Sequence, residues 1–325
     1  MSKSKKYNIQ IDILNLQGLF MHLFIKKLFT IFVFIFILFL LLIKPTLTLE
    51  YASQGLSIWY KSMLPTLFPM MILSGCMIKM NITSTISSLI YPVTKHLFHI
   101  SKNGTYALFI GLLCGFPMGA KVICELYNQN KLSKEEATSL LPICNNIGPI
   151  YMLSYGLKSF RANPIYIILI MFYCIPLAYA FFTLRKKHFA DFSSSTIKPS
   201  PFVIALDESI SDSALGMLSL GGYLMFFNIL LVPLELLSLN TYGKSFLSCF
   251  IEITNGLSKE TLLPPYIYLA LLQFGGLCCI FQTLKYTLKT DLNFYNYIFS
   301  KIKLSLITLI FFFAYYVFVS YVSCV

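Results

Sequence analysis

The sequence predicts an all-α integral membrane protein, folded as a polytopic helical bundle. Hydrophobic residues make up 57% of its 325 residues and only 12% are charged, whereas soluble domains carry about 25% charged residues. Mean hydropathy is +0.74. Apolar stretches close to the roughly 20 residues needed to cross a bilayer recur from Leu28 almost to the C-terminus. We therefore expect a single transmembrane domain over residues 1 to 325, in a bacterial cytoplasmic membrane.

Continuous apolar stretches predict the simple spans. The first is expected at residues 28 to 48 and remains uncleaved, because Lys26 and Lys27 precede it and no small-residue cleavage site follows. Residues 80 to 102 are less apolar and suit an amphipathic helix at the membrane surface. Further spans are expected at residues 56 to 78, 164 to 184, 209 to 237 and 298 to 319.

Other apolar stretches are interrupted, which predicts helices broken inside the membrane. In residues 105 to 128 the break falls at Gly115, Phe116, Pro117 and Gly119. Since Pro and Gly end a helix at mid-depth, this stretch is predicted to be a re-entrant hairpin. Similar interruptions occur in residues 137 to 157, 244 to 258 and 262 to 284.

The distribution of charge predicts the topology. Placing the N-terminus inside puts most of the 25 Lys and Arg residues in cytoplasmic segments. These segments are residues 1 to 27, 79 to 103, 129 to 136, 285 to 303 and a polar linker at residues 185 to 208. The halves at residues 56 to 157 and 209 to 284 then run in opposite senses, as an inverted repeat with two re-entrant hairpins. Many secondary transporters build a midplane site in this way. The alternative is a bundle of lipid-buried helices that are merely kinked by proline.

Lys121 is the residue that most needs a partner, since a charged group at membrane depth costs about 2.5 to 3.5 kcal/mol. One interpretation is that Lys121 and the N–H groups of the hairpin tip attract an anionic substrate. The other is an ion pair with Glu125, four residues on and on the same helix face. Gly111, Gly115 and Gly119 serve either the break or close helix packing.

Polar residues flank the remaining breaks. Asn145 and Asn146 offer amide groups either to a ligand or to the interrupted backbone. Glu252 is a candidate coupling carboxylate or a partner for Lys121, and Glu125 is a second coupling candidate. The predicted substrate-binding residues are Gly115, Pro117, Gly119, Lys121, Asn145, Asn146, Gly148, Asn255, Gln273, Gly275, Gly276 and Gln282.

Other classes of function lack their usual sequence signals. No H-E-x-x-H or G-x-S-x-G motif occurs, so no enzyme is predicted. The cysteines form no C-x-x-C, so no metal or other cofactor is expected. Basic residues lie between apolar segments rather than in a patch for nucleic acid. The expected partners are a small anionic substrate, the lipid bilayer and a coupling ion, H⁺ or Na⁺. Whether the chain forms a homo-oligomer stays open.

Several segments also carry a resemblance to a known family. SMLPTLFPMMILSG (62 to 75), GFPMGAK (115 to 121), the run at 128 to 149 and FGGLCCIFQT (274 to 283) resemble YlbJ-like sporulation integral membrane proteins. That family carries a nucleoside-recognition or Gate domain and is related in architecture to concentrative nucleoside transporters. The resemblance implies passage of dipicolinic acid into the forespore, across the mother-cell-derived outer forespore membrane. Nucleoside or nucleobase transport and a non-transporting sporulation scaffold are the alternatives.

Overall fold

The computed structural model describes residues 27, 28, 30–153, 165–187, 189, 199–254 and 263–324. Within these residues all regular structure is helical, which confirms the predicted all-α class. The described helices long and apolar enough to cross a membrane are Pro45–Lys79, Tyr166–Leu184, Phe202–Leu236, Pro265–Thr287 and Phe294–Tyr321.

The chain divides into two compact units, Met1–Tyr51 and Ala52–Val325. In the first unit an apolar helix covers Thr30–Ile43, so the span predicted over residues 28 to 48 is interrupted at Lys44. The reason is Pro45, which has no N–H to continue a helix but suits the first turn of the next one. That next helix is α2 (Pro45–Ile58).

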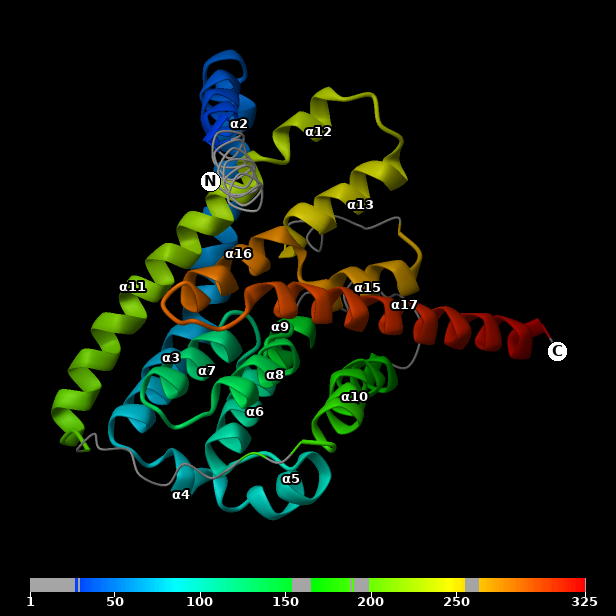
Figure 1. The fold of residues 1–325 in the computed structure, drawn as a ribbon. Helices are drawn as coiled ribbons and strands as arrows, with labels where there is room; N and C mark the ends of the chain where they lie inside the picture. Colours follow the sequence, from blue (N-terminus) through cyan, green and yellow to red (C-terminus); the bar gives the residue numbers. More distant parts are fainter. Residues whose placement is uncertain are drawn as a thin grey trace, which may run out of the picture. The chain divides into compact units, whose positions relative to one another are not determined.

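In the larger unit, the long helices α3 and α11 pack along each other (Figure 1). The Trp59 indole N–H donates to the carbonyl of Met217 at 2.8 Å, and Lys79 pairs with Asp212 at 2.8 Å. The residues from Phe202 to Glu208, predicted to be linker, are already helical, and the carboxylate of Glu208 pairs with Lys79 at 3.0 Å. This packing uses the π-helical turn Trp59–Met63, α3 (Leu64–Lys79) and α11 (Phe202–Ile229).

The predicted amphipathic segment at residues 80 to 102 forms two short helices rather than one. They are followed by three helices in mutual contact, α6, α7 and α8 (Figure 1). The hydroxyl of Ser101 accepts from the N–H of Gly104 at the start of α6, and Ser133 caps α8 in the same way. The bounds are α4 (Thr83–Ser87), α5 (Tyr91–Phe98), α6 (Lys102–Cys114), α7 (Met118–Asn128) and α8 (Lys134–Cys144).

The C-terminal helices pack against these three. Helix α17 runs along α15, and its start is capped by Asn293, whose side-chain oxygen accepts from the N–H of Asn296 at 3.2 Å. The last helix therefore starts earlier than residue 298, where the span was predicted. The remaining helices are α9 (Pro149–Tyr151), α10 (Ile165–Leu184), α12 (Val232–Leu236), α13 (Thr241–Ile251), α15 (Pro265–Phe274), α16 (Gly276–Thr287) and α17 (Phe294–Cys324).

Helices are interrupted at the places that the sequence indicated. Helix α6 ends at Cys114 and α7 begins at Met118, and the two helices pack against each other. Helix α15 likewise gives way to α16 at Gly275. The re-entrant course of these hairpins through a bilayer, and the inverted relation of the two halves, stay predictions.

Candidate functional site

Two of the helix interruptions touch through their backbones. Gly115 has φ of +75°, a conformation that favours glycine. A Cβ added there would overlap the backbone of Gly148. The next residue, Phe116, donates its N–H to the carbonyl of Asn146 at 2.7 Å. The break after α6 is thus joined directly to the break after α8.

The glycine row along α6 and α7 has a packing role in the same place. A Cβ on either Gly111 or Gly119 would overlap the carbonyl group of Cys144. Small residues therefore let the end of α8 approach both helices closely. Pro117 lies at the start of α7, where its missing N–H leaves no hydrogen bond unmade.

Asn146 lies at the centre of a buried polar cluster. Its side-chain oxygen accepts from the ammonium of Lys301 at 2.7 Å and from the amide of Gln273 at 2.8 Å. Its own amide group donates to the carbonyl of Ile143 at 2.6 Å. Through Asn146, the break after α8 is tied to both α15 and α17.

Asn145 extends this cluster toward α16. Its side-chain amide donates to the hydroxyls of Thr283 at 2.6 Å and Tyr297 at 3.0 Å. Its main-chain carbonyl accepts from Lys301 at 3.2 Å. The side-chain oxygens of Asn145 and Gln273 are buried with no partner among the described residues, so each can accept one more hydrogen bond. We refer to Asn145, Asn146, Gln273, Thr283, Tyr297 and Lys301 as the asparagine cluster.

Lys301 is the principal residue that the sequence analysis missed, because the segment at residues 285 to 303 was assigned to the cytoplasm. The structure buries Lys301 completely, at 0% exposure. Its ammonium lies 4.9 Å from the centre of the Phe116 ring, and no described carboxylate lies within ion-pair distance. The spacing of residues along the last helix could have predicted this burial. Lys301 falls on one face of α17 with the buried residues Tyr297, Leu304, Thr308 and Phe312.

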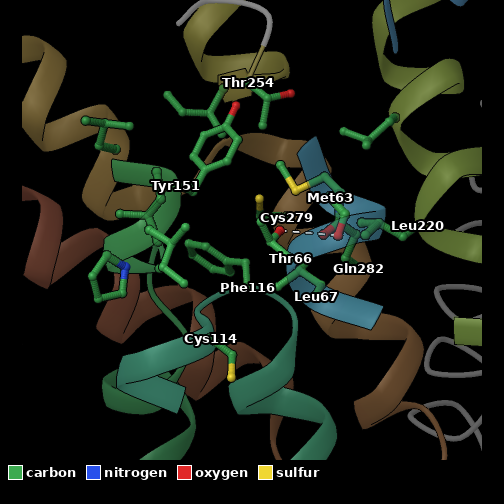
Figure 2. Close-up of a pocket in the computed structure, with 18 of the residues that line it drawn as sticks. Met63, Thr66, Leu67, Cys114, Phe116, Tyr151, Leu220, Thr254, Cys279 and Gln282 are labelled. Atoms are coloured by element: carbon green, nitrogen blue, oxygen red, sulfur yellow. Dashed lines mark hydrogen bonds between the residues drawn. The ribbon is translucent and has the colours of Figure 1, made fainter. Parts of the chain in front are cut away.

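A cavity of ≈ 290 Å³ lies beside this cluster and is lined mainly by apolar side chains. Each of the four helix interruptions contributes to its wall, and Figure 2 shows Phe116, Tyr151, Thr254 and Cys279 among the lining side chains. Helices α3 and α11 contribute residues such as Leu67 and Leu220. The polar side chains that line it are Thr66, Tyr151, Glu252, Thr254 and Gln282.

Glu252 is the acidic group of this cavity. It follows the end of α13 and is fully buried. Both its oxygens accept from the hydroxyl of Thr254 at 2.7 Å. Gly276 lies against the end of α13, because an added Cβ would be 3.2 Å from the carbonyl oxygen of Cys249. The break between α15 and α16 therefore touches the one that carries Glu252.

The predicted site residues fall into separate places. Gly148, Glu252, Gly275 and Gln282 line the cavity. Asn145, Asn146 and Gln273 belong to the asparagine cluster behind it, whereas Gly115, Pro117, Gly119 and Gly276 shape the breaks themselves. Asn255 lies outside the described residues.

Lys121 and Glu125 lie apart from the cavity. Their ammonium and carboxylate are 3.7 Å apart on adjacent turns of α7, and neither residue is among the described lining residues. The alternative partner of Lys121, Glu252, forms no ion pair with it in the described part of the chain. The described residues also hold no group of three or more His, Cys, Asp or Glu side chains placed to bind a metal ion.

The chain is similar to a known membrane protein. Over 142 residues the chain is 29% identical to the sporulation integral membrane protein YlbJ of Bacillus subtilis (strain 168). The matched region covers 43% of this chain and 35% of that protein. The chain is similar to a sporulation integral membrane protein. No family model and no solved structure matches it. With the five apolar helices, this similarity supports a multi-pass membrane protein.

Proposed function

We propose that this protein is a secondary transporter of a small organic anion, with the cavity as its substrate site. The observation that carries the proposal is the meeting of four helix interruptions, two from each half of the chain, around one cavity. Interrupted helices leave N–H and C=O groups free to bind a solute, and many secondary transporters place such breaks at the bilayer midplane. A broken helix at membrane depth is tolerated where it lines a cavity.

The charge near the cavity favours an anionic substrate. Lys301 lies behind Phe116, which itself lines the cavity. The cavity, at ≈ 290 Å³, is near the lower limit for small-molecule sites, about 300 Å³. By resemblance to sporulation integral membrane proteins, the candidate substrate is dipicolinic acid, a small planar dianion. The corresponding location is the outer forespore membrane.

We assign the coupling role to Glu252. A proton or Na⁺ that binds to a carboxylate in the cavity wall adds positive charge beside a bound anion. Binding of H⁺ or Na⁺ at Glu252 and binding of the anion therefore favour each other, and this coupling is reciprocal. Thr254, whose hydroxyl contacts both carboxylate oxygens, holds the group in place.

A second candidate substrate is a nucleoside or nucleobase. The cavity wall is mostly apolar, none of its described lining residues is a lysine, and Gln282 offers an amide that suits a neutral planar base. The third alternative, a non-transporting scaffold, has no need of a cavity where helix breaks meet.

The experiment that tests transport is uptake of labelled dipicolinate and labelled uridine into proteoliposomes. Leu220 lines the cavity and Leu218 on the same helix is 63% exposed. We expect Leu220→Trp to abolish uptake because the indole fills the cavity, whereas Leu218→Trp leaves uptake unchanged. Uridine uptake without dipicolinate uptake would favour the nucleoside alternative. If the wild-type protein takes up neither compound, the result would favour the non-transporting scaffold.

A further inference from the structure

We propose that Lys301 is the residue that recognises the carboxylate of the substrate, and that Phe116 is the movable cover between Lys301 and the cavity. This inference rests on the proposed transport function and names the chemical class of its substrate: a small carboxylic acid with a planar apolar body.

The first argument is the state of the Lys301 ammonium. It is fully buried, and its hydrogen-bond partners are the carbonyl oxygen of Asn145 and the side-chain oxygen of Asn146, both neutral. The described residues place no carboxylate within ion-pair distance of it. A buried ammonium without a counter-charge is unfavourable, so binding of an anion next to it is favoured.

The second argument is the unused donor. A lysine ammonium has three N–H groups, and two acceptors account for two of them. The third neighbour is the face of the Phe116 ring, at 4.9 Å from Nζ to the ring centre. A cation over an aromatic face is attracted more weakly than one that donates to a carboxylate. A substrate carboxylate can therefore replace the ring as the third partner of Lys301.

The third argument is the position of Phe116. Its backbone is held by the hydrogen bond to Asn146, and the far end of its ring lies against Gly275, between α15 and α16. The same side chain lines the cavity, whereas Lys301 does not. One ring thus separates the cation from the cavity. Rotation of this side chain uncovers Lys301 without any change in the hydrogen bonds of the asparagine cluster.

Lys121 is the weaker candidate for this role. It already has Glu125 as a partner at 3.7 Å, and it does not line the cavity. A lysine that is already paired gains less from an anion than one whose partners are all neutral.

The test compares charge preference in proteoliposomes. The probes are dipicolinate and its neutral analogue pyridine-2,6-dicarboxamide, which has the same shape without the charges. We expect Lys301→Gln to weaken dipicolinate uptake roughly 10- to 150-fold, the loss of one charge-assisted contact, while uptake of the diamide is unchanged. The matched control is Lys303→Gln, two residues along α17, where the lysine is exposed and lies over the Phe299 ring at 4.6 Å.

A purely structural role for Lys301 would lower uptake of both probes equally, and that result would overturn the inference. So would an unchanged preference for dipicolinate in Lys301→Gln. If the wild-type protein moves neither probe nor uridine, the transport function itself fails.

A second measurement uses the wild-type protein, in case Lys301→Gln does not fold. Reductive methylation followed by mass spectrometry reports the accessibility of each lysine. We expect slow methylation of Lys301 and protection by dipicolinate, with Lys303 methylated equally in both conditions. Equal methylation of Lys301 with and without dipicolinate, or none in either, would contradict the proposal, because Phe116 then uncovers no substrate site.

Discussion

At the scale of single residues, Gly275 determines whether Phe116 can occupy its position. Gly275 has φ of +91°, and a Cβ there would lie 2.5 Å from the far atom of the Phe116 ring. We expect Gly275→Ala to destabilise the protein by about 1 to 2 kcal/mol from backbone strain alone, and by more from the clash. Gly222→Ala is the control, since an added Cβ there meets nothing within 4 Å.

The clash can be separated from the strain with a second substitution. Phe116→Leu removes the outer ring atoms that an added Cβ at Gly275 would meet. We expect the double variant to unfold at a higher temperature than Gly275→Ala alone, a non-additive result typical of residues in contact. Additive losses in thermal unfolding would show that Phe116 and Gly275 do not interact.

The Lys121 and Glu125 pair leads to a different expectation. Lys121→Gln leaves the half-buried carboxylate of Glu125 without its cation and should lower stability by about 1 to 3 kcal/mol. Replacing both residues by glutamine should restore stability, because no charge is then left alone. Neither residue lines the cavity. The single variant, if it folds, and the double variant should therefore both take up dipicolinate at close to the wild-type rate. Loss of uptake in the stable double variant would instead support the prediction that Lys121 binds the substrate.

Lys121 and Lys301 show how much of the site could be predicted from the sequence. Lys121 attracted attention because an apolar stretch surrounds it, and the sequence held its partner four residues away. Lys301 lies two residues before Lys303 at the start of an apolar run, a pattern typical of a cytoplasmic boundary. Its burial depends on contacts with Asn145 and Asn146, about 155 residues earlier in the chain. Hydropathy carries no information on such contacts.

At the scale of helices, the interruptions were predictable and the helix ends were not. Glycine, proline and asparagine fix the breaks at Gly115, Asn145 and Gly275 through local backbone chemistry. By contrast, α11 already begins at Phe202, and Glu208 and Asp212 in its second and third turns pair with Lys79 of α3. That ion pair joins helices distant in sequence, so the same residues read as linker when only composition is considered.

At the scale of the whole larger unit, the structure has a second hollow, which the proposed transport function would use as an opening of the solute path. This polar hollow, of ≈ 520 Å³, lies between α8, α10 and α17 and includes Ser300, the residue before Lys301. Salt bridges lie at its edge, between Lys187 and Glu135 at 2.9 Å and between Lys134 and Asp291 at 2.7 Å. The hydrogen bond from Lys134 holds the pKa of Asp291 below its ordinary value. The asparagine cluster is tied to α8 and α17, which both line this hollow.

The side of the membrane on which this hollow opens can be measured. The charge distribution predicts that residues 129 to 136 are inside and residues 238 to 261 outside. Glu135 borders the hollow, and Tyr242, near the start of α13, is 59% exposed. Among the described cysteines only Cys174 is exposed, so replacing Cys174 and Cys324 by serine gives a background of low reactivity. Cysteines placed singly at positions 135 and 242 of that background can then be labelled with a membrane-impermeant maleimide.

We expect Glu135→Cys to react only in inside-out vesicles and Tyr242→Cys only in right-side-out vesicles or intact cells. The physical reason is that Lys and Arg near the helix ends are retained on the cytoplasmic side during insertion. The parent background, labelled from both sides, measures any signal from the buried cysteines. Labelling of both positions from one face would contradict the predicted inverted repeat. The polar hollow could then not be the inner opening of a path through two oppositely oriented halves.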